Sequence, residues 1–227
     1  MFRLLSHIMK AEDPVWPGNP AVAKIEVFNA IAGGEVANTA VLHLFSHSGT
    51  HLDAPKHFND AGKSAYQLPI ENYIFFAPLV LDVPKPDGGA ILREELEPYA
   101  EALQTADLAL LRTRWDSIRG SDPQRYSTEG PYLQPDGARF LMRYPGLKGV
   151  AIDAVSIGAP YALDESIETH QILTGVGRDD DRFLLILEDL RIDADLGAAS
   201  RIYAWPLLIE GSDGSPCTIV AEFPDRH

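Results

Sequence analysis

Four short apolar runs rich in branched side chains constrain the fold of this chain more than any other feature. They are residues 77–83, 108–113, 149–153 and 183–188. Short runs with so few polar residues are typical of strands that are buried on both faces of a sheet. Segments with helical character lie between them at residues 93–103, 136–144 and 164–173. This alternation predicts an α/β fold with a mixed, largely buried sheet.

Two further segments complete the expected architecture. Residues 203–223 carry two apolar arms around Gly211-Ser212-Asp213-Gly214, which predicts a C-terminal β-hairpin. The polar stretch 117–134 is expected to be a loop, either a lid over a binding site or a plain surface excursion. We expect residues 1–227 to form a single domain, because this length suffices for one well-packed core.

The composition disfavours several classes of function. The chain has 33 acidic and 19 basic residues, a net charge of -14, and such a field repels nucleic acids and anionic membrane surfaces. No apolar run reaches the roughly 18 residues of a membrane helix, and residues 1–10 carry no secretory cleavage pattern. We therefore expect a cytoplasmic protein that binds neither nucleic acid nor membrane. Its one cysteine, Cys217, cannot form an internal disulfide.

The main chemical signal is a cluster of histidines. Four of the seven, His43, His47, His51 and His57, lie within fifteen residues, and Asp53 lies among them. Neutral imidazoles with a carboxylate suit Zn²⁺ or Mn²⁺ rather than Cu(I), Ca²⁺ or an iron–sulfur cluster. The segment from His47 to His57 is therefore predicted to build a metal centre.

The spacing within the cluster also constrains its local structure. The intervals from His47 through His51 and Asp53 to His57 are all even, so an extended chain would place these side chains on one face. Ten residues of straight strand would span about 33 Å, whereas metal–ligand bonds are about 2 Å long, so the chain has to bend. Gly49 and Pro55 are the expected bends. His43 fits the spacing but lies in the apolar run 41–45, and we expect it to support the ligands or to be structural.

Other hydrolytic chemistries find less support in the sequence. The chain has no Gly-x-Ser-x-Gly motif, and Cys217 lies in a strand-like tail without an identifiable base. Residues 175–177 lack the third glycine of a dinucleotide fingerprint and follow a helix-like segment. These observations favour a metal-dependent mechanism over a serine or cysteine nucleophile.

The His47–His57 segment resembles the His-x-Gly-Thr-His-x-Asp-x-Pro-x-His signature of the metal-dependent cyclase family, which includes bacterial kynurenine formamidases and isatin hydrolases. The resemblance continues in the family's order at Pro14–Pro20, Ala151–Ser156 and Gly211–Pro216, and so covers nearly the whole chain. It implies the swivelling β/β/α cyclase-like fold. It also implies a homodimer or homotetramer with the N-terminal segment near a neighbouring active site.

The resemblance further implies the roles of individual residues. His47, His51 and Asp53 would bind one or two divalent ions, Zn²⁺ as first choice and Mn²⁺ as the alternative, with Asp53 as a possible bridge. His57 would be the catalytic acid/base. His170 and Glu188 match the contexts of two further ligands, although the charged insertion Arg178–Arg182 between them departs from the family pattern and leaves Asp189 as a rival to Glu188.

The implied function is a metal-dependent amidohydrolase that uses metal-activated water. It would cleave a C–N bond of a small amide, a formamide such as N-formylkynurenine, or a cyclic amide such as isatin. A lactonase acting on cyclic esters and a non-catalytic metal-binding protein remain as alternatives. Trp16 and Phe58 could line a pocket for an aromatic substrate or pack in the core, and Asp153 and Ser156 are expected to be structural.

Overall fold

A mixed sheet of nine strands forms the centre of the computed structural model, which describes residues 1–224. Eight strands lie in the order β5 (Ile74–Phe75), β12 (Arg201–Pro206), β13 (Gly214–Glu222), β4 (His51–Asp53), β11 (Leu185–Glu188), β10 (Gly149–Ile152), β8 (Leu108–Arg112) and β6 (Pro78–Asp82). The ninth, β1 (Phe2–Leu4), pairs with β13. Strands β6, β8, β10 and β11 are parallel, and the other pairings are antiparallel. The predicted mixed α/β fold is therefore confirmed.

The four apolar runs form the four parallel strands because each has a core on both of its faces. In β8, Ala109 and Leu111 pack in a core that the helices cover, whereas Leu108 and Leu110 pack in a second core. The second core also contains Ile202 and Ile219 from the antiparallel strands. The sheet therefore curls so that its antiparallel half covers one face of its parallel half.

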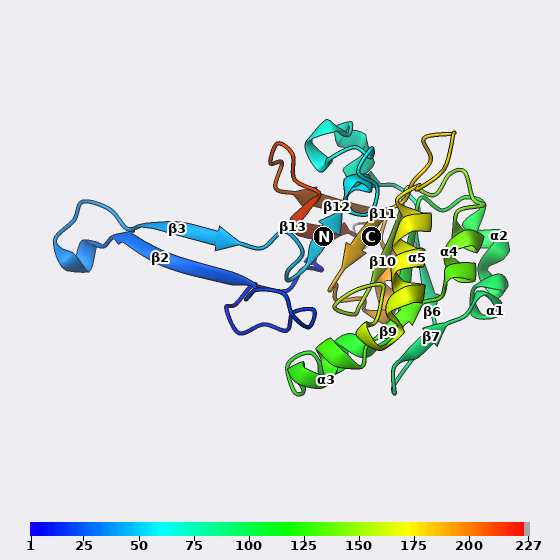
Figure 1. Cartoon of the computed structure of the whole chain (residues 1–227), viewed down its shortest axis with the longest axis horizontal. Helices are drawn as coiled ribbons and strands as arrows, with labels where there is room; N and C mark the ends of the chain where they lie inside the picture. Colours follow the sequence, from blue (N-terminus) through cyan, green and yellow to red (C-terminus); the bar gives the residue numbers. More distant parts are fainter. Residues whose placement is uncertain (225–227) are drawn as a thin grey trace.

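Helices cover the other face of the parallel strands, on the right of Figure 1. They are α1 (Arg93–Leu96), α2 (Ala100–Leu103), α4 (Pro135–Leu141) and α5 (Leu163–Leu173). The predicted helix over 93–103 is interrupted by a 3₁₀ turn at Glu97–Tyr99. The reason is Pro98, which has no N–H to donate and whose ring clashes with the preceding turn.

The polar stretch 117–134 is more ordered than the predicted loop. It contains α3 (Pro123–Thr128) and β9 (Pro131–Leu133), which pairs with β7 (Gly89–Ile91). Asp122 caps α3 by accepting a hydrogen bond from the backbone N–H of Arg125 at 3.1 Å. The prediction of a loop throughout this stretch was wrong because it gave no weight to this Asp-Pro cap.

A second hairpin was not predicted. Strands β2 (Ala23–Asn29) and β3 (Thr39–Leu44) pair with each other and extend away from the body of the molecule, at the left of Figure 1. The predicted C-terminal hairpin is present as β12 and β13. None of the helices in the described part of the chain has both the length and the apolar character needed to cross a membrane.

Candidate metal centre

The His47–His57 segment is held between two strands of the sheet. The chain turns at Gly49, which has a φ of 61°, runs as β4 through His51 and Asp53, and turns again in the 3₁₀ turn Pro55–His57. These are the two bends expected from the sequence. In β4, His51 lies opposite Glu188 of β11, and two residues along the strand Asp53 points to the same face.

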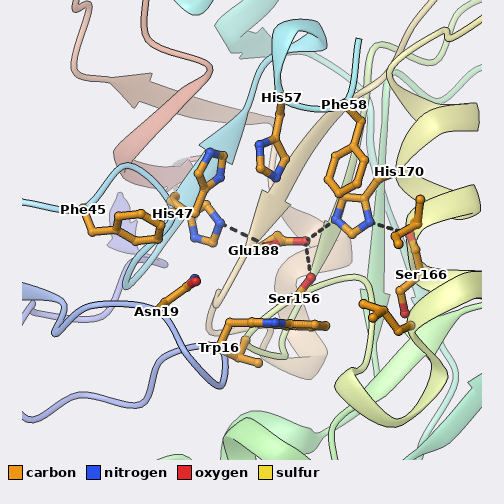
Figure 2. Close-up of a pocket in the computed structure, with 14 residues that line it drawn as sticks. Trp16, Asn19, Phe45, His47, His57, Phe58, Ser156, Ser166, His170 and Glu188 are labelled. Carbon is orange, nitrogen blue, oxygen red and sulfur yellow. Dashed lines mark hydrogen bonds and ion pairs between the residues drawn. The ribbon is translucent and has the colours of Figure 1, made fainter. Parts of the chain in front are cut away.

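This register and helix α5 bring the five predicted ligands together, and Figure 2 labels three of them, His47, His170 and Glu188. The Nε2 atom of His51 lies 3.1 Å from Oε2 of Glu188 and 3.5 Å from Oδ1 of Asp53. His170, on α5, places its Nε2 3.6 Å from Oε1 of Glu188 and 3.9 Å from Oδ2 of Asp53. The Nδ1 atom of His47 is 2.7 Å from Oδ1 of Asp53. Three imidazoles therefore surround two buried carboxylates.

Backbone carbonyls orient two of the three imidazoles. The Nδ1–H of His51 donates to the carbonyl of Gly49 at 2.8 Å, and the Nδ1–H of His170 donates to the carbonyl of Ser166 at 2.7 Å. With Nδ1 engaged in this way, each ring turns its Nε2 toward the carboxylates, and a metal ion would bind there in place of the Nε2 proton. That is the arrangement a metal-binding histidine requires.

The carboxylates of the centre are held in their charged form. Burial and the charge of Glu188 raise the pKa of Asp53, but His57 and His47 outweigh them and the net shift is downward. Burial likewise raises the pKa of Glu188, but hydrogen bonds with His170 and His51 outweigh burial, and the pKa lies well below its usual range. Two ionised carboxylates in a buried site require compensating positive charge.

One buried atom tests whether a cation fits here. Oδ2 of Asp53 has no hydrogen-bond partner among residues 1–224, although a buried carboxylate oxygen is costly to leave unpaired. Asp53 also belongs to two sets of three residues, one with His47 and His57 and one with His51 and Glu188, whose ligand atoms all lie within 4.8 Å of one another. The residues therefore fit one or two divalent ions of the kind that imidazole and carboxylate ligands bind.

The structure distinguishes Glu188 from its rival Asp189. Asp189 has a positive φ of 57°, and its side chain turns away from the centre to accept two hydrogen bonds of 2.7 Å from Arg119. Glu188 instead faces the imidazoles, and its Oε1 accepts from the Ser156 hydroxyl at 3.0 Å and from the Ile157 backbone N–H at 2.6 Å.

Two expectations about supporting residues need correction. Ser156 was expected to be purely structural, yet it hydrogen-bonds Glu188 and lines the pocket over the centre. The sequence signal for this role was the position of Ser156 in the Ala151–Ser156 segment, which is part of the resemblance to the cyclase family. His43 was expected to support the ligands or to be structural, but it lies exposed on β3, away from the centre, where its Nε2 is 3.4 Å from the Glu26 carboxylate. Asp153 is buried as expected and accepts from the backbone N–H groups of Thr113 and Arg114.

A largely apolar pocket of about 240 Å³ opens over the centre. Trp16 and Phe58 line it on opposite sides, as Figure 2 shows, and Phe45, Leu163 and Ile167 complete its apolar wall. The ring of Phe58 stacks on His170 with 4.5 Å between ring centroids. No lysine or arginine of the described chain lines this pocket. The pocket therefore combines flat apolar side chains with groups that can bind a metal ion.

His57 lies at the edge of the centre, with its ring stacked on His47 at 3.7 Å between centroids. Its Nδ1 is 3.0 Å from Oδ2 of Asp213, and the same oxygen is 2.8 Å from Nε2 of His47. Burial disfavours the charged form of His47, but Asp53 and Asp213 outweigh it and raise the pKa of His47 to about 10. The sequence predicted only a turn at Asp213, so this contact was missed.

Comparison with known proteins agrees with this architecture. The model of the family described as "Putative cyclase" matches residues 4–159. Kynurenine formamidase of Geobacillus thermodenitrificans is 30% identical over 220 residues, which cover 94% of this chain and 91% of that protein. Cyclase-like protein 1 of Arabidopsis thaliana is 26% identical over 219 residues, covering 93% and 81% of the two chains.

The fold has a close solved counterpart. The structure of isatin hydrolase A from Labrenzia aggregata bound to benzyl benzoate superposes with a TM-score of 0.80 at 22% identity, over 99% of this chain and 94% of that one. The matched motif, the sheet and the share of the chain covered lead to one conclusion. This chain belongs to the putative cyclase family.

Proposed function

We propose that this protein is a metal-dependent hydrolase that cleaves the C–N bond of a small amide, formamide or cyclic amide. One observation carries the proposal: three imidazoles and two buried carboxylates converge beneath an apolar pocket, and one carboxylate oxygen, Asp53 Oδ2, has no hydrogen-bond partner within residues 1–224. The names of a full-length relative, a kynurenine formamidase, and of a structural neighbour, an isatin hydrolase, support the reaction class.

The ligands of the ion would be His47, His51, Asp53, His170 and Glu188. A bound divalent ion, Zn²⁺ by first expectation and Mn²⁺ as the alternative, would supply Lewis acidity and lower the pKa of water at the site. Trp16 and Phe58 would hold the flat part of the substrate between them, which limits its orientation in the pocket.

His57 would move the proton. It lines the pocket, and its Nδ1 is occupied by Asp213, so Nε2 is the nitrogen left to accept a proton from the attacking water. The same nitrogen can return that proton to the departing amine. Such general acid–base catalysis typically contributes about 10²–10⁴-fold to a rate.

The test combines metal analysis with turnover. Purified wild type, Asp53→Ala and His57→Ala are compared for bound zinc and manganese by elemental analysis, and for hydrolysis of N-formylkynurenine and isatin. We expect wild type to hold metal and hydrolyse at least one amide, and Asp53→Ala to lose both metal and activity. His57→Ala should keep the metal and lose about 10²–10⁴-fold in kcat, because it removes only the proton carrier.

Asp60→Ala is the matched control, because the Asp60 side chain is fully exposed in the same loop region. A wild type that holds metal but is inert toward both amides would contradict the proposed function. Faster turnover of ester or lactone analogues would assign a lactonase instead. A His57→Ala protein without metal would make His57 a ligand rather than the acid/base.

A further inference from the structure

A single carboxylate oxygen connects the proposed acid/base to a proposed metal ligand. Oδ2 of Asp213 lies 2.8 Å from Nε2 of His47 and 3.0 Å from Nδ1 of His57, and the two imidazole rings are stacked. Asp213 comes from the loop between β12 and β13, about 160 residues away in sequence from both histidines. Only the fold brings these three side chains together.

The backbone holds Asp213 firmly against the rings. Its carbonyl accepts a hydrogen bond from the N–H of Ala54 at 3.0 Å, and the next residue, Gly214, is in register with Asp53 across the β13–β4 pair. Gly214 has to be a glycine for this approach, because a Cβ there would lie 2.6 Å from Cε1 of His47. The loop therefore packs directly against the His47 imidazole, and this packing limits the positions that the Asp213 carboxylate can take.

The contacts determine which nitrogen of each ring carries a proton. A carboxylate oxygen at hydrogen-bond distance from an imidazole nitrogen accepts from an N–H group, and Oδ2 of Asp213 lies at that distance from both His47 Nε2 and His57 Nδ1. The ring of His57 therefore donates through Nδ1–H, which leaves the lone pair of Nε2 free. The ring of His47 donates to Asp213 through Nε2–H, so Nδ1, which faces Asp53, is the nitrogen that would release its proton to bind a metal ion.

We infer that Asp213 is a positioning residue that holds His57 and His47 in the tautomers their proposed roles require. The inference rests on the proposed function of the site and adds a residue to it. Asp213 does not line the substrate pocket, so it acts through the two imidazoles rather than on the substrate. Outer partners of ligating histidines typically contribute about 10- to 100-fold to activity or metal affinity.

The inference predicts a graded effect of two substitutions. Asp213→Ala removes both hydrogen bonds, and kcat should fall about 10- to 100-fold with little change in KM. Asp213→Asn keeps an oxygen that can accept the same N–H groups without the negative charge, and should recover part of that loss. The control is Glu210→Ala, which removes the same charge from an exposed position of the same loop and should behave as wild type. Kinetics are measured on zinc-loaded protein with the amide that wild type hydrolyses.

A second readout does not depend on activity. In protein labelled with ¹⁵N at histidine and loaded with zinc, the imidazole ¹⁵N shifts of His57, assigned with His57→Gln, should show protonated Nδ1 in wild type and in Glu210→Ala. Asp213→Ala should shift His57 toward a mixture of tautomers. Unchanged kcat and unchanged imidazole shifts in Asp213→Ala would overturn the inference while leaving the proposed function intact. A wild type inert toward amides would overturn the proposed function, and the ¹⁵N shifts would still test Asp213.

Discussion

Arg119 and Asp189 form a buried ion pair next to Glu188 of the candidate metal centre. Arg119 donates to both carboxylate oxygens of Asp189 at 2.7 Å, and Tyr126 donates its hydroxyl to the same carboxylate at 2.7 Å. Asp189 follows Glu188 in sequence and is 1% exposed. This ion pair therefore holds the end of β11, and with it the backbone that carries Glu188.

The prediction at the residue scale is that Arg119→Ala lowers the free energy of unfolding by about 3–5 kcal/mol, because it leaves the charge of Asp189 buried without its partner. Chemical denaturation of wild type and variant in chelator measures the effect without a contribution from metal. Arg178→Ala, which removes an exposed partner of Asp180, is the control and should change stability little. A loss of under 1 kcal/mol in Arg119→Ala would show that other contacts hold the β11 end.

At the scale of elements, the β2–β3 hairpin carries an apolar face that nothing in the described chain covers. Its cross-strand pairs Ala23–Leu44, Ile25–Leu42 and Val27–Ala40 lie on one face, and Ile25, Leu42 and Val27 are 68%, 60% and 69% exposed. The opposite face carries Lys24 and His43, whose Nζ and Nε2 atoms lie 3.5 Å and 3.4 Å from Oε2 of Glu26. A lone two-stranded hairpin is only marginally stable in water, so such a face needs a partner.

We propose that this face packs against a second copy of the chain in a homodimer or homotetramer, since a two-fold axis pairs one apolar face with itself. Ile25→Glu should then shift the protein toward monomer in light scattering coupled to size exclusion, measured over a range of concentrations. Lys24→Glu, the adjacent residue on the opposite face, should keep the wild-type mass. A monomeric wild type, or an Ile25→Glu protein of unchanged mass, would contradict this assembly.

The secondary-structure elements differ in how well the sequence predicted them. The runs at 77–83, 108–113, 149–153 and 183–188 predicted strands correctly because burial on both faces requires continuous apolar residues. The β2–β3 hairpin was missed because it packs on neither core of residues 1–224, so burial on two faces does not mark its strands with continuous apolar residues. The stretch 117–134 was misjudged because its order rests on the Asp122 cap of α3 and on the burial of Tyr126, and neither produces an apolar periodicity in the sequence.

At the scale of the whole molecule, metal binding should be linked to pH. In the metal-free protein the carboxylates around His47 raise its pKa to about 10, above the ordinary value of 6.5, so the folded chain holds a proton there at neutral pH. This proton stabilises the metal-free fold fully below pH 6.5, and the stabilisation is lost as the pH rises through about 10. A metal ion has to displace the proton, so it binds more tightly as the pH rises.

The expected outcome is that the gain in Tm on adding zinc is larger at pH 8 than at pH 6. Thermal unfolding in zinc and in chelator, at both pH values, gives the two differences directly. Asp53→Ala should show no gain at either pH, because the ligand common to both candidate sets is gone. An equal gain at both pH values would show that metal binding displaces no proton in this range.

The histidine cluster and the four apolar runs were sufficient to predict a metal centre and a sheet buried on both faces. The His47–His57 spacing requires a bent, extended segment, and the apolar runs require strands buried on both faces. Both features can be predicted because spacing and burial are reflected in the residue types of neighbouring positions. Three features became visible only in the folded chain: Glu188 rather than Asp189 faces the centre, Ser156 hydrogen-bonds Glu188, and Asp213 joins His47 to His57. These contacts join residues distant in sequence through strand register and loop placement, and no local pattern encodes which side chains such a register brings together.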